Sequence, residues 1–136
     1  MIHDLRFHHH GLAVREDTEA LTFLALLGYN CSVPVYDPVQ NVRLRLCSHD
    51  AMPTVEIVMP GEGPGPLDAI LRRQDQLLYH TCYEVDDRAA VLGALEQADL
   101  RVFEVLGPTP AILFGGRQVS FHTVLGFGLI ELLDRA

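Results

Sequence analysis

HHGLAV at residues 9–14 returns in related form as HTCYEV at residues 80–85. Each stretch is a strand-compatible run that begins with His and is followed by an acidic helix start. TVEIV at residues 54–58 and LIELL at residues 129–133 also match, since each places one Glu among apolar residues. The paired His residues are 71 positions apart and the paired Glu residues 75 positions apart. An internal repeat explains both pairs.

Each copy of the repeat predicts the element order β-α-β-β-β. In the first copy we expect a strand that ends near Val14, a helix over about 18–27 that Gly28 ends, and strands over about 30–36, 41–47 and 53–59. In the second copy we expect a strand over about 78–85, a helix over about 87–97, and strands over about 101–105, 111–114, 118–122 and 129–133, with one hairpin closed by Gly115-Gly116. Asp17 or Thr18 suits the first helix N-cap, and Asp86 or Asp87 the second.

The Gly- and Pro-rich stretch 61–66 is the strongest break in the chain, and a short helix over Leu67–Arg73 is expected after it. We interpret residues 61–77 as the connection between a first module at about 6–60 and a second at about 78–134. A chain of 136 residues is long enough for one sizeable core and too short for two. The prediction is a single α+β domain over residues 1–136.

The composition excludes some classes of partner. With 10 Lys+Arg against 18 Asp+Glu and a formal charge of -8, the chain lacks the basic face that nucleic acid requires. Neither a membrane span nor a signal peptide is recognisable, so the cytoplasm is the expected compartment. The three cysteines, Cys31, Cys47 and Cys82, are widely spaced and outside any CxxC arrangement, and we expect buried, reduced thiols.

The two repeated Glu residues, Glu56 and Glu131, are the first candidates for chemistry. A carboxylate in the middle of an apolar strand is costly to bury unless it is paired, protonated or bound to a metal. Each Glu belongs to a module that also has a strand-borne His, and His with carboxylate suits divalent Zn, Mn, Co, Ni or Fe. Four such residues would form a coordination shell. Taken singly, a strand His is often structural and a strand Glu often lies on the wet face of a sheet.

Four segments, HHHGLAV at 8–14, PTVEIVMP at 53–60, LYHTCYEVDD at 78–87 and GLIELLD at 128–134, resemble the vicinal oxygen chelate superfamily over nearly the whole chain. This superfamily includes glyoxalase I, methylmalonyl-CoA epimerase, extradiol dioxygenases and bleomycin-type resistance proteins. The resemblance implies two βαβββ modules that are paired in an open, curled β-sheet barrel around one divalent ion. It assigns the metal ligands to His9, Glu56, His80 and Glu131. His9 is chosen because the family ligand stands two residues before the Gly of H-x-G, here Gly11, and His8 and His10 should then point to the opposite side.

The resemblance also implies a function, a metal-dependent lyase or isomerase/epimerase of glyoxalase type that acts on a small carbonyl or thioester substrate. Glu131 is the expected proton carrier. Methylmalonyl-CoA epimerases place a second catalytic Glu where this chain has Leu44. Other groups could serve in its place, and the sequence does not choose among them: Tyr36, Tyr83, Cys82, His122 and Glu84.

Two alternatives remain open: a non-catalytic small-molecule binding or antibiotic-resistance protein of the same fold, and an extradiol-type oxygenase. A small molecule is the expected partner, with neither nucleic acid nor membrane, and a homodimer is compatible with the family. A thioester or glutathione adduct would call for basic groups near the site. The available arginines are interpreted as surface residues: Arg43, Arg45, Arg72, Arg73 and Arg117.

Overall fold

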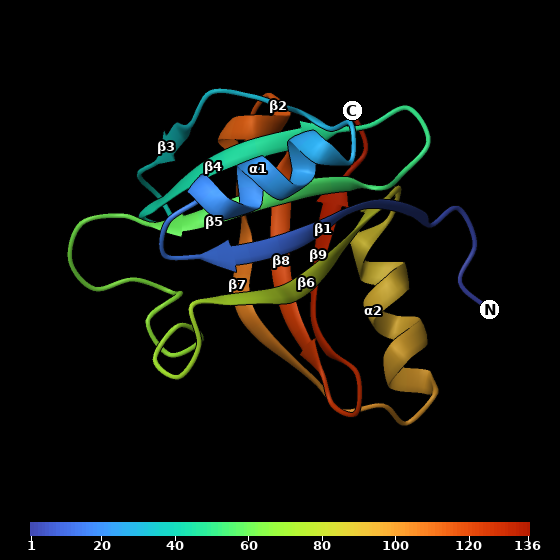
Figure 1. The fold of residues 1–136 in the computed structure, drawn as a ribbon. Helices are drawn as coiled ribbons and strands as arrows, with labels where there is room; N and C mark the ends of the chain where they lie inside the picture. The colour runs from blue at the N-terminus through green and yellow to red at the C-terminus, as the bar shows by residue number, and fades with distance from the viewer. The chain divides into compact units, whose positions relative to one another are not determined.

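The computed structural model describes residues 1–136 and contains two α-helices and nine β-strands (Figure 1). The fold is therefore α+β, as the sequence predicts. The chain divides into an N-terminal module of residues 9–79 and a C-terminal module of residues 1–8 and 80–136, and each is described by itself. Neither helix is long and apolar enough to cross a membrane.

The N-terminal module follows the predicted β-α-β-β-β order with one strand divided in two. Its elements are β1 (Arg6–Val14, of which residues 9–14 belong to this module), α1 (Thr18–Leu26), β2 (Asn30–Cys31), β3 (Val35–Asp37), β4 (Val42–Ser48) and β5 (Thr54–Pro60). The strands lie in the order β2-β4-β5-β1, with β3 also paired to β4. β1 runs parallel to β5, whereas β4 is antiparallel to its partners.

One face of this module packs against α1 and the other carries the His and Glu residues. Because side chains alternate along a strand, Val14, Ile57 and Met59 fall on the α1 face, where they form a buried cluster with Leu24 of the helix. His9, Gly11 and Ala13 are the buried positions on the other face of β1, as predicted, and His8 and His10 are only half-buried. The apolar packing behind the sheet thus fixes which side chains face forward.

The C-terminal module repeats the architecture. Its elements are β6 (Gln76–Val85, of which residues 80–85 belong to this module), α2 (Arg88–Gln97), β7 (Val102–Pro110), the short 3-10 helix η1 (Ile112–Phe114), β8 (Gln118–Val124) and β9 (Gly128–Asp134). The strands lie in the order β6-β9-β8-β7, with β6 parallel to β9 and the other pairs antiparallel. The cluster beneath α2 contains Val85, Val91, Val124, Ile130 and Leu132.

Three expected elements are wrong in detail. Residues 66–72 form hydrogen-bonded turns where a helix over 67–73 is expected, although Leu67 and Leu71 are buried as one turn of a helix would bury them. Residues 111–114 contain η1 instead of a strand, and its C-cap Gly115 has a left-handed φ of 64°. The strand expected over 30–36 is split into β2 and β3 by a segment that contains Pro34, because proline cannot donate a ladder hydrogen bond.

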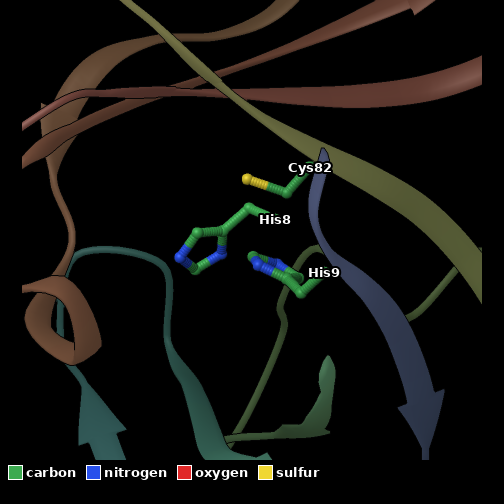
Figure 2. Close-up of side chains that lie close together, drawn as sticks. All are labelled: His8, His9 and Cys82. Atoms are coloured by element: carbon green, nitrogen blue, oxygen red, sulfur yellow. The ribbon is translucent and has the colours of Figure 1, made fainter. Parts of the chain in front are cut away.

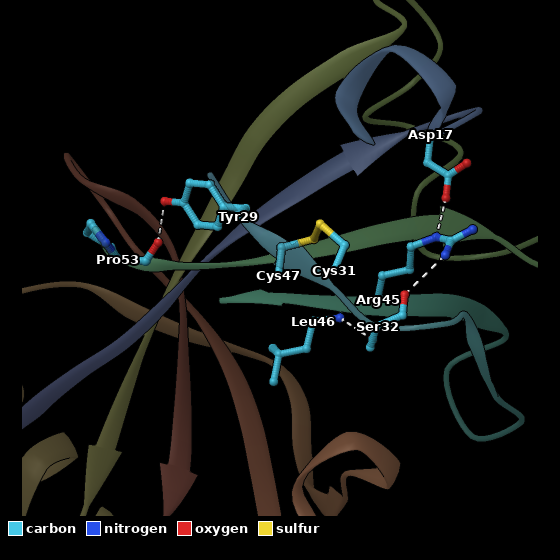
Figure 3. Close-up of a disulfide and its surroundings, with 8 residues drawn as sticks. All are labelled: Asp17, Tyr29, Cys31, Ser32, Arg45, Leu46, Cys47 and Pro53. Carbon is cyan, nitrogen blue, oxygen red and sulfur yellow. Dashed lines mark hydrogen bonds and ion pairs between the residues drawn. A yellow bond between two sulfur atoms is a disulfide. The ribbon is translucent and has the colours of Figure 1, made fainter. Parts of the chain in front are cut away.

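The expectation of three reduced cysteines is also wrong. Cys31 of β2 and Cys47 of β4 form a disulfide (Figure 3). Cys82 is buried and takes no part in a disulfide. The two bonded residues are directly opposite each other in the antiparallel β2–β4 register. Neighbouring contacts hold the same edge, since Leu46 donates its backbone N–H to Ser32 Oγ and Arg45 pairs with Asp17. The disulfide thus ties a two-residue edge strand to the sheet.

Candidate metal centre

The N-terminal module brings His9 and Glu56 together on its forward face. β1 and β5 are parallel, and Glu56 stands opposite Gly11, two residues beyond His9 on the same face of β1. Gly11 has no side chain, which leaves the Glu56 carboxylate room to turn toward the imidazole. His9 Nε2 lies 3.6 Å from Glu56 Oε1, with exposed fractions of 0% and 5% for the two residues.

The C-terminal module brings together His80 and Glu131 in the same way. β6 and β9 are parallel, and Glu131 stands opposite Cys82, two residues beyond His80. His80 Nε2 lies 3.2 Å from Glu131 Oε1, and both residues are buried. The His80 ring also makes an edge-to-face contact with Phe121, which is the β8 residue opposite Glu131. Strand pairing therefore produces the same His–Glu arrangement in both modules.

The geometry of each pair suits two ligands of one metal ion. Donor atoms about 2.1 Å from a metal lie about 3.0 Å apart at a right angle and about 3.4 Å apart in a tetrahedron. The observed Nε2–Oε1 separations of 3.6 and 3.2 Å are close to this range. The four residues each offer one ligand atom, an imidazole nitrogen or a carboxylate oxygen. Such donors fit intermediate divalent ions.

The β4 residues beside Glu56 on the forward face offer no proton donor. In the antiparallel β4–β5 register Leu46 stands opposite Glu56 and Leu44 opposite Val58, so Leu44 shares the face of Glu56. Leu44 is buried, with an exposed fraction of 6%. The position that the sequence comparison marked as lacking a second acid is thus apolar in the structure as well.

In the C-terminal module, Cys82 and Glu84 share the face of β6 that carries His80. The prediction that His8 points to the opposite side is wrong, because a ring nitrogen of His8 lies within 4.8 Å of the Cys82 sulfur (Figure 2). Glu84 accepts a hydrogen bond from Arg117 Nη2 at 2.6 Å, and Arg117 Nε donates to the backbone oxygen of Asp134. The pKa of Glu84 is lowered, first by the Arg117 hydrogen bond and against the effect of burial. Glu84 is therefore held as a carboxylate.

Arg117 and Arg45 are more than the surface residues that the sequence suggested. Each guanidinium is about one-fifth exposed and is paired with an acidic side chain far away in the chain, Glu84 for Arg117 and Asp17 for Arg45. No local sequence signal marks these pairs, because the partners are 33 and 28 positions away. The Arg117–Glu84 pair connects the loop before β8 to β6, and the Arg45–Asp17 pair connects β4 to the start of α1.

Of the other proposed second acids, Tyr36, Tyr83 and His122 lie elsewhere. Tyr36 is half-exposed and donates its hydroxyl to Asn41 Oδ1. Tyr83 packs against the α2 cluster on the opposite face of β6. His122 stands opposite Ile130 of that cluster, so it lies on the α2 side of β8. Of the five proposed second acids, only Cys82 and Glu84 share the forward face with the C-terminal ligand pair.

The two βαβββ modules and their buried His–Glu pairs define a class of protein. A family model of the glyoxalase/bleomycin resistance protein/dioxygenase superfamily matches residues 8–121, and the chain belongs to this superfamily. The sequence resemblance is thereby confirmed. No curated protein matches the sequence significantly.

Solved structures share the fold at low sequence identity. Methylmalonyl-CoA epimerase from Mycobacterium tuberculosis is 18% identical with a TM-score of 0.77, and the match covers 96% of this chain and 88% of that chain. A hypothetical protein from Bacillus halodurans is 16% identical with a TM-score of 0.80, covering 98% and 96%. A variant of Streptomyces coelicolor methylmalonyl-CoA epimerase in complex with 2-nitronate-propionyl-CoA is 17% identical with a TM-score of 0.74, covering 96% and 97%. These similarities concern the fold.

Proposed function

We propose that His9, Glu56, His80 and Glu131 together hold one divalent metal ion, and that the protein is a metal-dependent lyase or isomerase of glyoxalase type. One observation carries the proposal: the same buried His–Glu pair occurs in both modules, at the same place in the strand register. A packed core would favour apolar residues at these positions, because burying four ionisable groups is costly without a ligand to share.

The reaction proposed is proton transfer next to a carbonyl or thioester group of a small substrate. When bound, the metal would supply Lewis-acid stabilisation of the negative charge that develops on the substrate carbonyl oxygen. Glu131 is the base that takes the proton from the neighbouring carbon. Its carboxylate is buried next to His80, and Phe121 shields that part of the face from water. Exclusion of water strengthens the electrostatic interactions within such a site.

Leu44 favours a reaction with a single base. Two-base epimerisation requires a proton carrier on each face of the reacting carbon. Leu44 and Leu46 present only hydrocarbon beside Glu56, and Glu84 is held as a carboxylate by Arg117. We therefore favour chemistry in which Glu131 removes a proton from one carbon and delivers it to the neighbouring carbon on the same face of the substrate. Methylmalonyl-CoA and the hemithioacetal of a 2-oxoaldehyde represent the two types of substrate.

The experiment compares turnover by the wild-type protein and by Glu131→Gln, each stripped with chelator and reloaded with Zn, Ni, Co, Mn or Fe(II). We expect exchange of the substrate α-proton with D₂O in at least one metal form, with loss by about 100-fold or more in Glu131→Gln. Glu16→Gln, an exposed acid of the N-terminal module, is the matched control. Tight binding of either substrate without proton exchange in any metal form would contradict the proposed enzymatic function and indicate a binding protein. No metal binding at all would refute the site.

A further inference from the structure

The C-terminal module has a hollow of about 530 Å³ beside the end of α2 and the start of β7. Its apolar lining includes Leu92, Leu100 and Phe103. His122 of β8 also lines it, and in the β8–β9 register His122 stands one residue beyond Phe121, which faces Glu131. Successive residues of a strand point to opposite faces. The hollow is therefore on the face of this sheet away from the His80–Glu131 pair.

His122 is a buried polar residue, and only one of its two ring nitrogens makes a hydrogen bond within the protein. Its exposed fraction is 2%, and its Nε2 lies 2.8 Å from the Oγ of Ser120, which is fully buried. Nδ1 makes no hydrogen bond within the protein. When Nε2–H donates to Ser120, Nδ1 offers a lone pair to a ligand in the hollow. Burial lowers the pKa of His122 more than the Glu104 charge raises it, and Arg88 lowers it further, so the imidazole is uncharged.

The repeat shows that the fold does not require a polar pair at this place. The registers around Glu56 and Glu131 correspond when Leu46 is matched to Phe121, which matches Cys47 to His122 and Cys31 to Glu104. The N-terminal module fills this place with a disulfide. The C-terminal module instead has a Glu opposite a His, next to a hollow. Packing alone therefore does not account for His122 and Glu104.

We propose that this hollow binds a small molecule that carries a protonated amine on an apolar group. Glu96 and Glu104 contribute two carboxylates to its lining and Arg101 one guanidinium, so the hollow is net negative in a chain that already carries a charge of -8. The ammonium group would donate to His122 Nδ1 and to the Glu104 carboxylate. The apolar group would pack on the leucine and phenylalanine walls. This site is independent of the metal-dependent function.

The test compares three probes of similar shape, 2-phenylethylamine, 2-phenylethanol and 3-phenylpropionate, by NMR titration of the full chain. We expect the amine to bind with a Kd on the order of 1 mM. The amine should shift the methyl signals of Leu92 and Leu100 and the ring signals of His122. Its Kd should be at least threefold lower than that of the alcohol. The carboxylate should give no saturable shift. Equal binding of amine and alcohol, or shifts away from these residues, would overturn the proposal.

Variants test the charge recognition separately. Glu104→Gln and Glu96→Gln should each weaken amine binding about threefold to fivefold, because each removes one partly solvated charge. Glu16→Gln, which removes an exposed carboxylate from the other module, should leave binding unchanged. Unaltered affinity in both hollow variants would contradict the proposal. The comparison of the three probes on the wild-type protein decides the question even where a variant does not fold.

Discussion

The two modules have the same forward face but differ on the face that packs against the helix. Both hold a buried His–Glu pair between parallel strands, and the same register produces both. Behind the sheet, the N-terminal module has the Cys31–Cys47 disulfide where the C-terminal module has Glu104 and His122. The feature that both modules share is thus the His–Glu pair proposed to take part in chemistry. The residues on the helix-facing side of the sheet differ between the modules.

The largest effect tests whether the shared β-sheet packing is equally important in both modules. Ile57 and Leu132 are equivalent, almost fully buried residues, each next to a proposed ligand in the chain. Ile57→Ala and Leu132→Ala should each lower the free energy of unfolding by about 2–5 kcal/mol, from lost burial and the cavity left behind. Chemical denaturation measures both. A loss below 1 kcal/mol in one variant would show that its module is loosely packed.

The disulfide should give the next largest effect, and only in the N-terminal module. Cys31→Ala combined with Cys47→Ala removes a cross-link between residues 16 positions apart, which is expected to cost about 3 kcal/mol of stability. Thermal unfolding with and without dithiothreitol measures the same difference in the wild-type protein. Dithiothreitol should leave the double variant unchanged. If the wild-type protein does not respond to reduction either, the disulfide does not support the edge strand.

The two helix starts are stabilised in different ways, and each interaction is expected to contribute up to about 1 kcal/mol to stability. Asp87 is the N-cap of α2, and its side chain accepts a hydrogen bond from the backbone N–H of Ala90. Asp87→Ala should therefore cost about 1 kcal/mol. Asp17 is the N-cap of α1 but makes no side-chain cap bond and pairs with Arg45 instead. A double-mutant cycle should give about 0.5–1 kcal/mol of coupling between Asp17 and Arg45. A coupling of zero would remove this distinction.

The smallest expected effect is the pH response of His122. The N-terminal module has the disulfide-bonded Cys47 at the equivalent position. The pKa of His122 is lowered in the folded protein, chiefly by burial. The unfolded chain then binds more protons as the pH falls below about 6.5, so the free energy of unfolding should decrease on acidification. His122→Gln should lose this component of the slope between pH 7 and pH 5. An identical slope in the variant would show that the ring titrates normally.

Much of the fold could be predicted because hydrophobic periodicity and the repeat are local signals. The alternation His9, Gly11, Ala13 and the apolar strand around Glu131 fixed the strands and their inward faces. The split at Pro34 and the turns over 66–72 could not be predicted with the same certainty, since tertiary packing decides short elements. Leu67 and Leu71 have helical spacing and are buried, yet this segment of the N-terminal module forms turns.

The candidate ligands could be predicted as well, because a Glu in an apolar strand stands out in the sequence. Their pairing within each module, His9 with Glu56 and His80 with Glu131, depends only on two parallel strands. Long-range partners were harder to predict. The Cys31–Cys47 disulfide requires the β2–β4 register, and the Arg117–Glu84 pair requires a loop to fold back over β6. Local sequence patterns predict neither the strand register nor the path of the loop.

The most direct test of the account is the number of metal ions per chain, measured by elemental analysis and native mass spectrometry after zinc loading. One shared site predicts one tightly held ion in the wild-type protein. His9→Ala and His80→Ala, one from each module, should each weaken binding by at least about 100-fold. His3→Ala, an exposed histidine, is the control and should retain the ion. Two ions per chain, or one tightly held ion in both ligand variants, would contradict a single site built from both modules.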